Sequence, residues 1–328
     1  MATTLQLPVE GELPSLDGAT GWLNSEPLTP ASLRGRPVLV EFWTFTCINW
    51  LRTLPYVRAW SEKYRDDGLV VLGVHTPEFE VERDLANIRR ATEAMGIEFP
   101  IAADSEYRVW RAFDNQYWPA LYFADADGRI RHHRFGEGEY DYSELVIQQL
   151  LAAAGARDVS TELAAVNPTG IEAEADWEDL RSPETYLGYS RAERFVSPGG
   201  ASRDEPREYE VPAALNLNRW GLVGDWTIGR QAAVVNAPGG TIAHRFHARD
   251  LHLVMAPARD DRPVRFRVLL DGDPPGAAHG VDSDSDGEGS VTEPRLYQLI
   301  RQPTPVSDRS FEITFLDAGA RAYVFTFG

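Results

Sequence analysis

The residue of this sequence best suited to nucleophilic chemistry is its single cysteine, Cys47. It lies in residues 41–50 (EFWTFTCINW), where an apolar run that predicts a buried strand gives way to helical periodicity. A thiol at such a junction faces the free N–H groups and the positive end of the helix, which favour the thiolate. Cysteines of this kind have pKa values of roughly 3.5–7.5. The alternative is a small buried hydrophobic residue, a common state of a lone cysteine.

The elements that must position Cys47 follow the order strand–helix–strand–helix–strand, then a hairpin and a closing helix. The Asp127-Gly128 pair is a good signal for that hairpin. This order predicts an α/β sandwich with a mixed sheet. The predicted strands are 37–44, 68–75, 99–103, 120–124 and 129–135, and the predicted helices are 48–64, 82–95, 105–113 and 142–154.

Three further features accompany the cysteine: Glu41 lies six residues before it, Pro55 lies eight residues after it, and Trp118-Pro119 precedes the hairpin. With these features, residues 10–155 resemble the thioredoxin-like family, and within it the TlpA- and DipZ-like thiol-disulfide proteins.

The resemblance implies a role for each residue. Cys47 matches the first, attacking cysteine of the family, and Glu41 matches a buried carboxylate that manages protons near the thiol. Pro55 matches the proline that kinks the first long helix. Trp118-Pro119 matches the cis-proline loop, whose backbone edge could pair with a bound substrate chain.

The sequence departs from the family pattern at Trp50, which stands where the second, resolving cysteine is expected. A Cys-x-x-Cys pair resolves its mixed disulfide internally, whereas Cys47 needs a second molecule to release it. The chain could therefore be a monothiol disulfide exchange enzyme that acts on a disulfide-containing protein or a small thiol. It could also be a non-catalytic binding scaffold.

A one-cysteine peroxidase is a third possibility, because Thr44 lies three residues before Cys47, as in peroxiredoxins. The proline that those enzymes place four residues earlier is Val40 here. His75 ends the second predicted strand, and it could line the site or be a hydrogen-bonded structural histidine.

The second half of the chain shows short alternating apolar runs separated by glycine, proline and aspartate, which predict an all-β sandwich of jelly-roll type. We therefore expect a thioredoxin-like domain over 1–155, an acidic linker over 156–205 and a β domain over 206–328.

The β half resembles the carbohydrate-binding-module-like domain that follows the thioredoxin domain in DipZ-like proteins. Residues 183–189, 224–227 and 294–301 carry this resemblance. A sugar or peptide ligand is possible there, and Trp220 and Trp226 could stack on it, although buried tryptophan is common in β-sandwiches.

An acidic run in the β half has the spacing of a calcium loop. Oxygen ligands would come from Asp282, Asp284, Asp286 and Glu293, with Gly287 at the sharp turn. The alternative is a solvated acidic loop between strands. No other cofactor is expected.

The formal net charge of −18 argues against nucleic acid and anionic membrane as partners, because both require clustered Lys and Arg. No apolar run is long enough to span a bilayer, and residues 1–10 lack the pattern of a secretory signal. We therefore expect a cytoplasmic protein.

Overall fold

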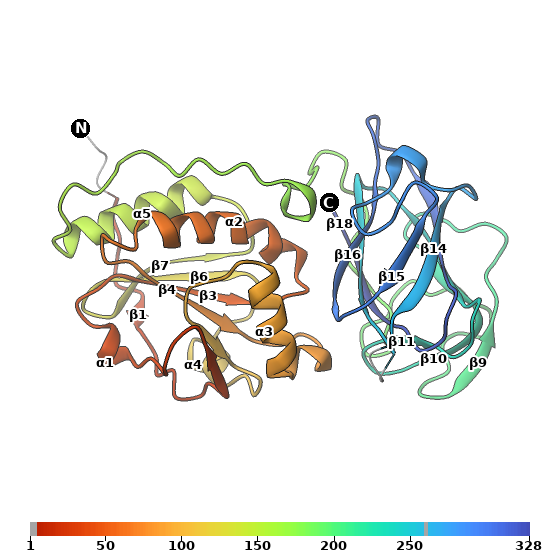
Figure 1. The fold of residues 1–328 in the computed structure, drawn as a ribbon, viewed down its shortest axis with the longest axis horizontal. Helices are drawn as coiled ribbons and strands as arrows, with labels where there is room; N and C mark the ends of the chain where they lie inside the picture. The colour runs from red at the N-terminus through yellow and green to blue at the C-terminus, as the bar shows by residue number, and fades with distance from the viewer. Residues whose placement is uncertain (1–4, 259–261) are drawn as a thin grey trace. The chain divides into compact units, whose positions relative to one another are not determined.

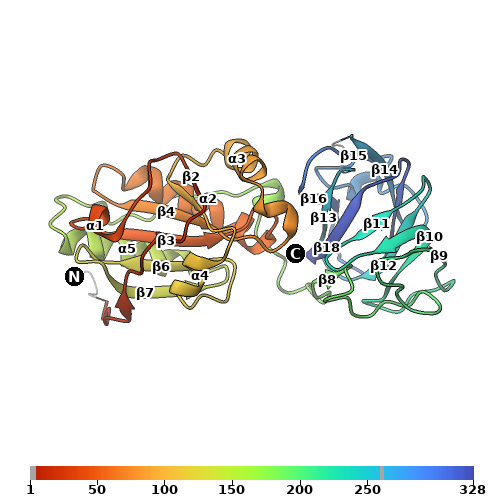
Figure 2. The same ribbon diagram turned by 90° about the horizontal axis from the view of Figure 1, so that it is seen from below.

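The computed structural model describes residues 5–258 and 262–328 of the chain. They form two compact units, of which the first ends at Ala173 and the second begins at Glu174. Figure 1 and Figure 2 show that the first unit combines helices with a sheet and that the second is built from strands.

The described residues of the first unit form one mixed sheet. Its strands are β1 (Gly11–Glu12), β2 (Gly21–Leu23), β3 (Val38–Trp43), β4 (Val70–His75), β5 (Ile101–Ala103), β6 (Ala120–Ala124) and β7 (Arg129–Phe135). They lie in the order β1-β7-β6-β3-β4-β5-β2. β3, β4 and β5 are parallel, and the other neighbouring pairs are antiparallel.

Helices cover both faces of this sheet. They are α1 (Pro30–Leu33), α2 (Ile48–Lys63), η1 (Glu80–Arg83), α3 (Leu85–Ala94), α4 (Arg108–Ala112), α5 (Tyr140–Ala153) and η2 (Gly170–Glu172), where η denotes a 3-10 helix. α2 and α5 lie along one face, and α4 lies on the other (Figure 1). The end of α3 lies beside α2, because Arg58 of α2 donates to the carbonyl of Met95 at 2.6 Å. The single helix predicted over 82–95 is found as two elements, η1 and α3, with Asp84 between them.

Side-chain alternation along β3 determines what lies on each face of the sheet. Phe42 points to the α4 face, where its ring meets that of Phe113 edge to face at 5.0 Å. Glu41 and Trp43 point to the opposite face, beneath α2, where both contact Trp50. The strand is buried along its whole length, so a carboxyl group at position 41 is enclosed in the core.

Residues 156–173 form a connecting segment that runs along α5 and α2 (Figure 1). Glu144, a buried residue of α5, joins the segment to α2. Its carboxylate accepts hydrogen bonds of 2.7–2.9 Å from the side chains of Trp60, Lys63 and Tyr64 and from the backbone N–H of Ala164. Near the end of the segment, Glu172 forms an ion pair of 2.7 Å with Arg58 of α2.

The second unit consists of antiparallel strands. They are β8 (Thr185–Tyr186), β9 (Pro206–Tyr209), β10 (Trp220–Ile228), β11 (Ala233–Val235), β12 (Thr241–Phe246), β13 (Asp250–Ala256), β14 (Val264–Leu270), β15 (Glu288–Val291), β16 (Arg295–Arg301), β17 (Arg309–Phe315) and β18 (Arg321–Phe327). The order is β15-β14-β17-β12-β10-β11-β18-β13-β16, with β8 beside β18 and β9 beside β10. Side chains from both ends of this order share one core, so the sheet curls back on itself.

The curl occurs within β10. Its first half pairs with β12, and its second half pairs with β9 and β11. Gly224 lies between the halves with a φ of 88°, a backbone conformation that glycine adopts without strain. The predicted α/β domain followed by an all-β domain is confirmed, and the jelly-roll connectivity stays a prediction.

The observed boundary between the two units, at Ala173 and Glu174, lies inside the linker predicted over 156–205, most of which belongs to one unit or the other. The first part of that stretch is bound to α2 and α5, whereas Thr185–Tyr186 pairs with β18 and Phe195 forms a bridge with Trp220. Because these contacts are irregular or very short, they leave no periodic pattern in the sequence.

Candidate functional site

Cys47 is the N-cap residue of α2, and its side chain is half-buried. β3 ends at Trp43, and residues 44–47 then form a tight turn in which the Cys47 N–H donates to the Thr44 carbonyl at 3.2 Å. The Cys47 carbonyl in turn accepts from the N–H of Leu51 at 2.9 Å. The thiol therefore lies at the positive end of a 16-residue helix, as the sequence predicts.

The loop that precedes β6 lies beside this thiol in space. The Cys47 Sγ lies 3.7 Å from the carbonyl oxygen of Trp118, and the Trp118–Pro119 peptide bond is cis. The Trp118 indole N–H donates to the Thr76 carbonyl at 3.0 Å, and the Pro119 carbonyl accepts from the N–H of Gly136 at 2.9 Å. The structure thus brings together residues that are 71 positions apart in the sequence.

Trp50 and Glu41 form a buried pair beneath the start of α2. Both side chains are fully buried, and the Trp50 indole N–H donates to Glu41 Oε1 at 2.8 Å. The Trp50 ring also stacks on Trp43 with ring centres 4.3 Å apart. Burial raises the pKa of Glu41 to about 7, although the Trp50 hydrogen bond opposes the shift. The position predicted for a resolving thiol is thus occupied by a core side chain.

His75, at the end of β4, is a buried residue that contacts the turn of residues 44–47. Its Nε2 lies 3.5 Å from the Thr44 hydroxyl, and its ring packs against those of Trp43 and Phe45. Burial lowers the pKa of His75 to about 3, so the imidazole is neutral at physiological pH. Of the two interpretations offered by the sequence, a structural histidine fits these contacts.

Glu82 is a site residue that the sequence interpretation missed, because it was assigned only to the start of a helix. Its fully buried carboxyl group accepts a hydrogen bond from the hydroxyl of Thr46, the residue before Cys47, at 2.5 Å. No spacing rule links these residues, which are 36 positions apart. A run of glutamates at 78, 80 and 82 directly after β4 is the only hint in the sequence.

The acidic loop of the second unit uses its carboxylates in local contacts. Asp282 pairs with Arg295 at 2.7 Å, and Asp284 Oδ1 accepts from the backbone N–H groups of Asp286 and Glu288. Glu293 lies 3.5 Å from the Arg295 guanidinium. In the two described ranges, no group of three or more His, Cys, Asp and Glu side chains is arranged to hold a metal ion. The calcium site therefore stays a prediction from spacing.

The two tryptophans considered for ligand stacking lie in the β core. Trp220 and Trp226 are fully buried, and their indole N–H groups donate to the carbonyls of Glu193 and Val223 at 2.8 and 2.9 Å. Buried tryptophan is thus the state found at both positions, and binding of a sugar or peptide by the β domain stays a prediction.

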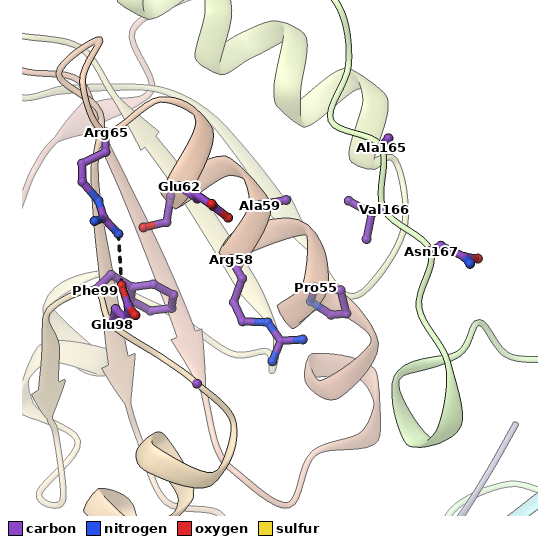
Figure 3. A pocket seen from close by; sticks show the side chains of 12 residues that line it. Pro55, Arg58, Ala59, Glu62, Arg65, Glu98, Phe99, Ala165, Val166 and Asn167 are labelled. Carbon is purple, nitrogen blue, oxygen red and sulfur yellow. Dashed lines mark hydrogen bonds and ion pairs between the residues drawn. The ribbon is translucent and has the colours of Figure 1, made fainter.

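A separate pocket of about 510 Å³ lies beside the second half of α2 (Figure 3). Its two arginines are already ion-paired, Arg58 with Glu172 and Arg65 with Glu98. Neither Cys47 nor the Trp118-Pro119 loop lines this pocket, which is therefore distinct from the thiol site. Among the helices that the structure describes, none is long and apolar enough to cross a membrane.

Two family models match the chain. Residues 11–133 match the AhpC/TSA family, and residues 182–328 match a family described as the thioredoxin-like C-terminal domain. The two matches fall in the first and second units respectively.

Curated relatives include thiol-disulfide proteins. Protein DipZ of Mycobacterium tuberculosis is 35% identical over 272 residues, which cover 80% of this chain and 38% of DipZ. The chain thus spans little more than a third of the length of that relative. Thiol-disulfide oxidoreductase YkuV of Bacillus subtilis is 32% identical over 140 residues, which cover 43% of this chain and 94% of YkuV. The solution structure of an oxidised thioredoxin-like protein is 33% identical, with a TM-score of 0.41, over 44% of this chain and 97% of that one.

Proposed function

The chain belongs to the thioredoxin-like family of thiol-disulfide oxidoreductases, and from this premise we propose that it exchanges disulfides through a single nucleophilic cysteine, Cys47. The observation that carries the proposal is the position of that thiol. It is partly exposed at the N-terminus of α2 and lies 3.7 Å from the carbonyl of Trp118, the residue before cis-Pro119. A thiolate is stabilised at such a position, and the adjacent backbone can pair with an extended substrate.

The chemistry requires two bimolecular steps. The Cys47 thiolate attacks one sulfur of a substrate disulfide, a new S–S bond forms to Cys47, and the other substrate sulfur leaves as a thiolate that takes up a proton. A second thiol, from a small molecule or a protein, then attacks the substrate sulfur of the mixed disulfide as its thiolate. The S–S bond to Cys47 breaks, a new S–S bond joins the second thiol to that substrate sulfur, and Cys47 leaves as a thiolate. One disulfide is thus exchanged for another, and a further external thiol that attacks the new disulfide would complete the two-electron reduction of the substrate.

The external thiol is needed because the first turn of α2 offers no second sulfur. Trp50 fills the corresponding position, and its indole N–H is bonded to Glu41. The other carboxyl oxygen, Glu41 Oε2, is buried and has no hydrogen-bond partner among the described residues. Glu41 therefore anchors the start of α2 through Trp50, the residue at the position where a dithiol protein would have its resolving cysteine.

Two alternative functions predict different behaviour of the same thiol. In a binding scaffold, Cys47 would react more slowly in the folded protein than in the unfolded chain. In a one-cysteine peroxidase, hydrogen peroxide would oxidise Cys47 faster than a disulfide does. Thr44, whose spacing from Cys47 suggests the peroxidase, is fully buried with its hydroxyl 3.5 Å from His75, which does not favour that role.

The deciding experiment exposes the full chain to oxidised glutathione near neutral pH and follows the mass of the protein. We expect one glutathione to attach to Cys47 faster in the folded protein than in urea, and excess reduced glutathione to remove it. The Cys47→Ser variant should gain no mass. Slower attachment in the folded protein would instead support the scaffold, and preferential reaction with hydrogen peroxide would support the peroxidase.

A further inference from the structure

A buried carboxyl group supports the turn that carries the reactive cysteine. Glu82 Oε1 accepts the hydroxyl proton of Thr46 at 2.5 Å, and Glu82 Oε2 accepts the backbone N–H groups of Glu78 and Phe79 at 2.6 and 2.8 Å. Neither Glu82 nor Thr46 has more than 2% of its surface exposed. One carboxyl group therefore joins the turn before Cys47 to the loop that follows β4.

This connection acts on the short turn that leads directly into Cys47. The Cys47 N–H is bonded to the Thr44 carbonyl within the turn, and β3 ends at Trp43. If the turn shifts, the thiol shifts with it, away from both the helix N-terminus and the Trp118 carbonyl. Small displacements of a reacting group can slow a reaction by about a hundredfold.

We propose that Glu82 is a positioning residue for Cys47, which acts through Thr46 to hold the thiol at the N-terminus of α2 and beside Trp118. This inference rests on the proposed function, because the position of the thiol matters for activity only if Cys47 reacts.

Three buried titratable groups lie in or beside the elements that hold the turn, namely Glu82, Glu41 and His75. Burial, reinforced by the charge of Glu78, raises the pKa of Glu82 to about 7, while hydrogen bonds from Thr44 and Thr46 oppose the shift. Burial also raises the pKa of Glu41 on β3 to about 7 and lowers the pKa of His75 on β4 to about 3. Glu41 and His75 stay unchanged in the variants below, so differences between the pH profiles report on Glu82 and Thr46.

The test measures the pH dependence of Cys47 alkylation by iodoacetamide in the full chain and in two variants. Thr46→Val removes the hydroxyl and keeps the carboxyl group. Glu82→Gln removes the charge and breaks at least one of the two connections, because only one of its two amide atoms can accept hydrogen bonds. If the turn loosens, the thiol pKa rises toward its ordinary value of about 8.5. We expect the midpoint of the alkylation profile to rise by about one pKa unit in both variants, so that at pH values below the parent midpoint alkylation is about tenfold slower.

Two matched variants serve as controls. Thr46→Ser keeps the hydroxyl group and should keep the parent profile. Glu80→Gln makes the same charge change in η1 at a side chain that is 77% exposed, and it should also match the parent. The helical circular-dichroism signal confirms that each variant is folded, and Thr46→Val preserves side-chain size if Glu82→Gln does not fold.

The direction of the shift separates positioning from a simple charge effect. Loss of a nearby negative charge alone would lower the thiol pKa in Glu82→Gln and leave Thr46→Val unchanged, and that result would overturn the proposal. Unchanged profiles in both variants would overturn it too. A parent thiol that reacts no faster than in the unfolded chain would refute the proposed function, and this inference with it.

Discussion

The buried carboxyl group of Glu41 should make the first unit less stable as the pH rises. Its pKa is raised from 4.5 to about 7 by burial. Below the ordinary pKa, the group is protonated in both the folded and the unfolded chain, and its contribution to stability is fully present. Between the two pKa values the unfolded chain releases a proton that the folded chain retains, so the free energy of unfolding falls as pH rises through about 7.

The size of this effect follows from the shift. About 2.5 pKa units correspond to about 3 kcal/mol, of which about 2 to 3 kcal/mol lies between about pH 5 and about pH 9. Glu41→Gln keeps an oxygen that can accept the Trp50 indole N–H and removes the titration. Relative to the parent, the variant should therefore gain about 2 to 3 kcal/mol of unfolding free energy on going from about pH 5 to about pH 9.

Urea unfolding followed by the helical circular-dichroism signal measures this difference. The signal reports the first unit, because the α-helices of the described residues all lie there. Comparison of the two pH values cancels any pH-independent cost of the substitution, and Glu82 titrates equally in both proteins. Glu62→Gln, at an exposed carboxylate of the same helix, should behave like the parent. If Glu41→Gln and the parent differ by the same amount at both pH values, the reasoning fails.

Three more outcomes are expected. Trp50→Cys should form an internal disulfide with Cys47, seen as a two-proton mass loss on oxidation, and a variant that forms disulfides only between molecules would contradict this. The same change should lower the unfolding free energy by roughly 3–5 kcal/mol, because it empties a large core site. Burial lowers the pKa of His244 to about 3, so as the pH falls from about 6.5 to about 3 the unfolded chain binds a proton that the folded chain does not, and the parent loses stability. At about pH 5, His244→Phe should therefore retain about 2 kcal/mol more of its unfolding free energy than the parent, as measured by hydrogen exchange in β12; equal acid sensitivity of the two proteins would argue against this. Asp284→Ala should destabilise the second unit by about 1 kcal/mol, because it removes the acceptor for two backbone N–H groups, with or without calcium; a melting temperature that calcium raises in the parent but not in Asp284→Asn would instead establish the calcium site.

Much of the first unit follows from local sequence signals. The hairpin of β6 and β7 has the predicted bounds, because Asp127-Gly128 marks the turn and apolar runs flank it on both sides. The strand-to-helix junction at Cys47 was also predicted, since the change of hydrophobic period is abrupt there. By contrast, β9, β11 and β15 were missed, because strands of three or four residues leave too short a pattern.

In the candidate site too, residues with a local signal could be predicted, and residues that depend on long-range contacts could not. Cys47 and the Trp118-Pro119 loop could be identified from residue type and family resemblance. The role of Glu82 could not, because it depends on a hydrogen bond to Thr46 across 36 residues and on burial that no local pattern encodes. The acidic loop shows the reverse case: its spacing fits calcium, but Arg295, 13 residues after Asp282, forms an ion pair with the Asp282 carboxylate.

The connecting segment has a practical consequence for anyone who cuts this protein into parts. A fragment that ends at residue 155, where the periodic pattern of the first domain stops, would lose the Ala164 N–H that bonds to the buried Glu144 carboxylate and the ion pair between Glu172 and Arg58. It would also uncover the surface of α2, the helix that begins at the reactive thiol. A fragment that ends at Ala173 keeps these contacts. Low solubility or an altered thiol reactivity of the shorter fragment would therefore reflect the missing segment, and such a fragment should not be used to judge the activity of the intact chain.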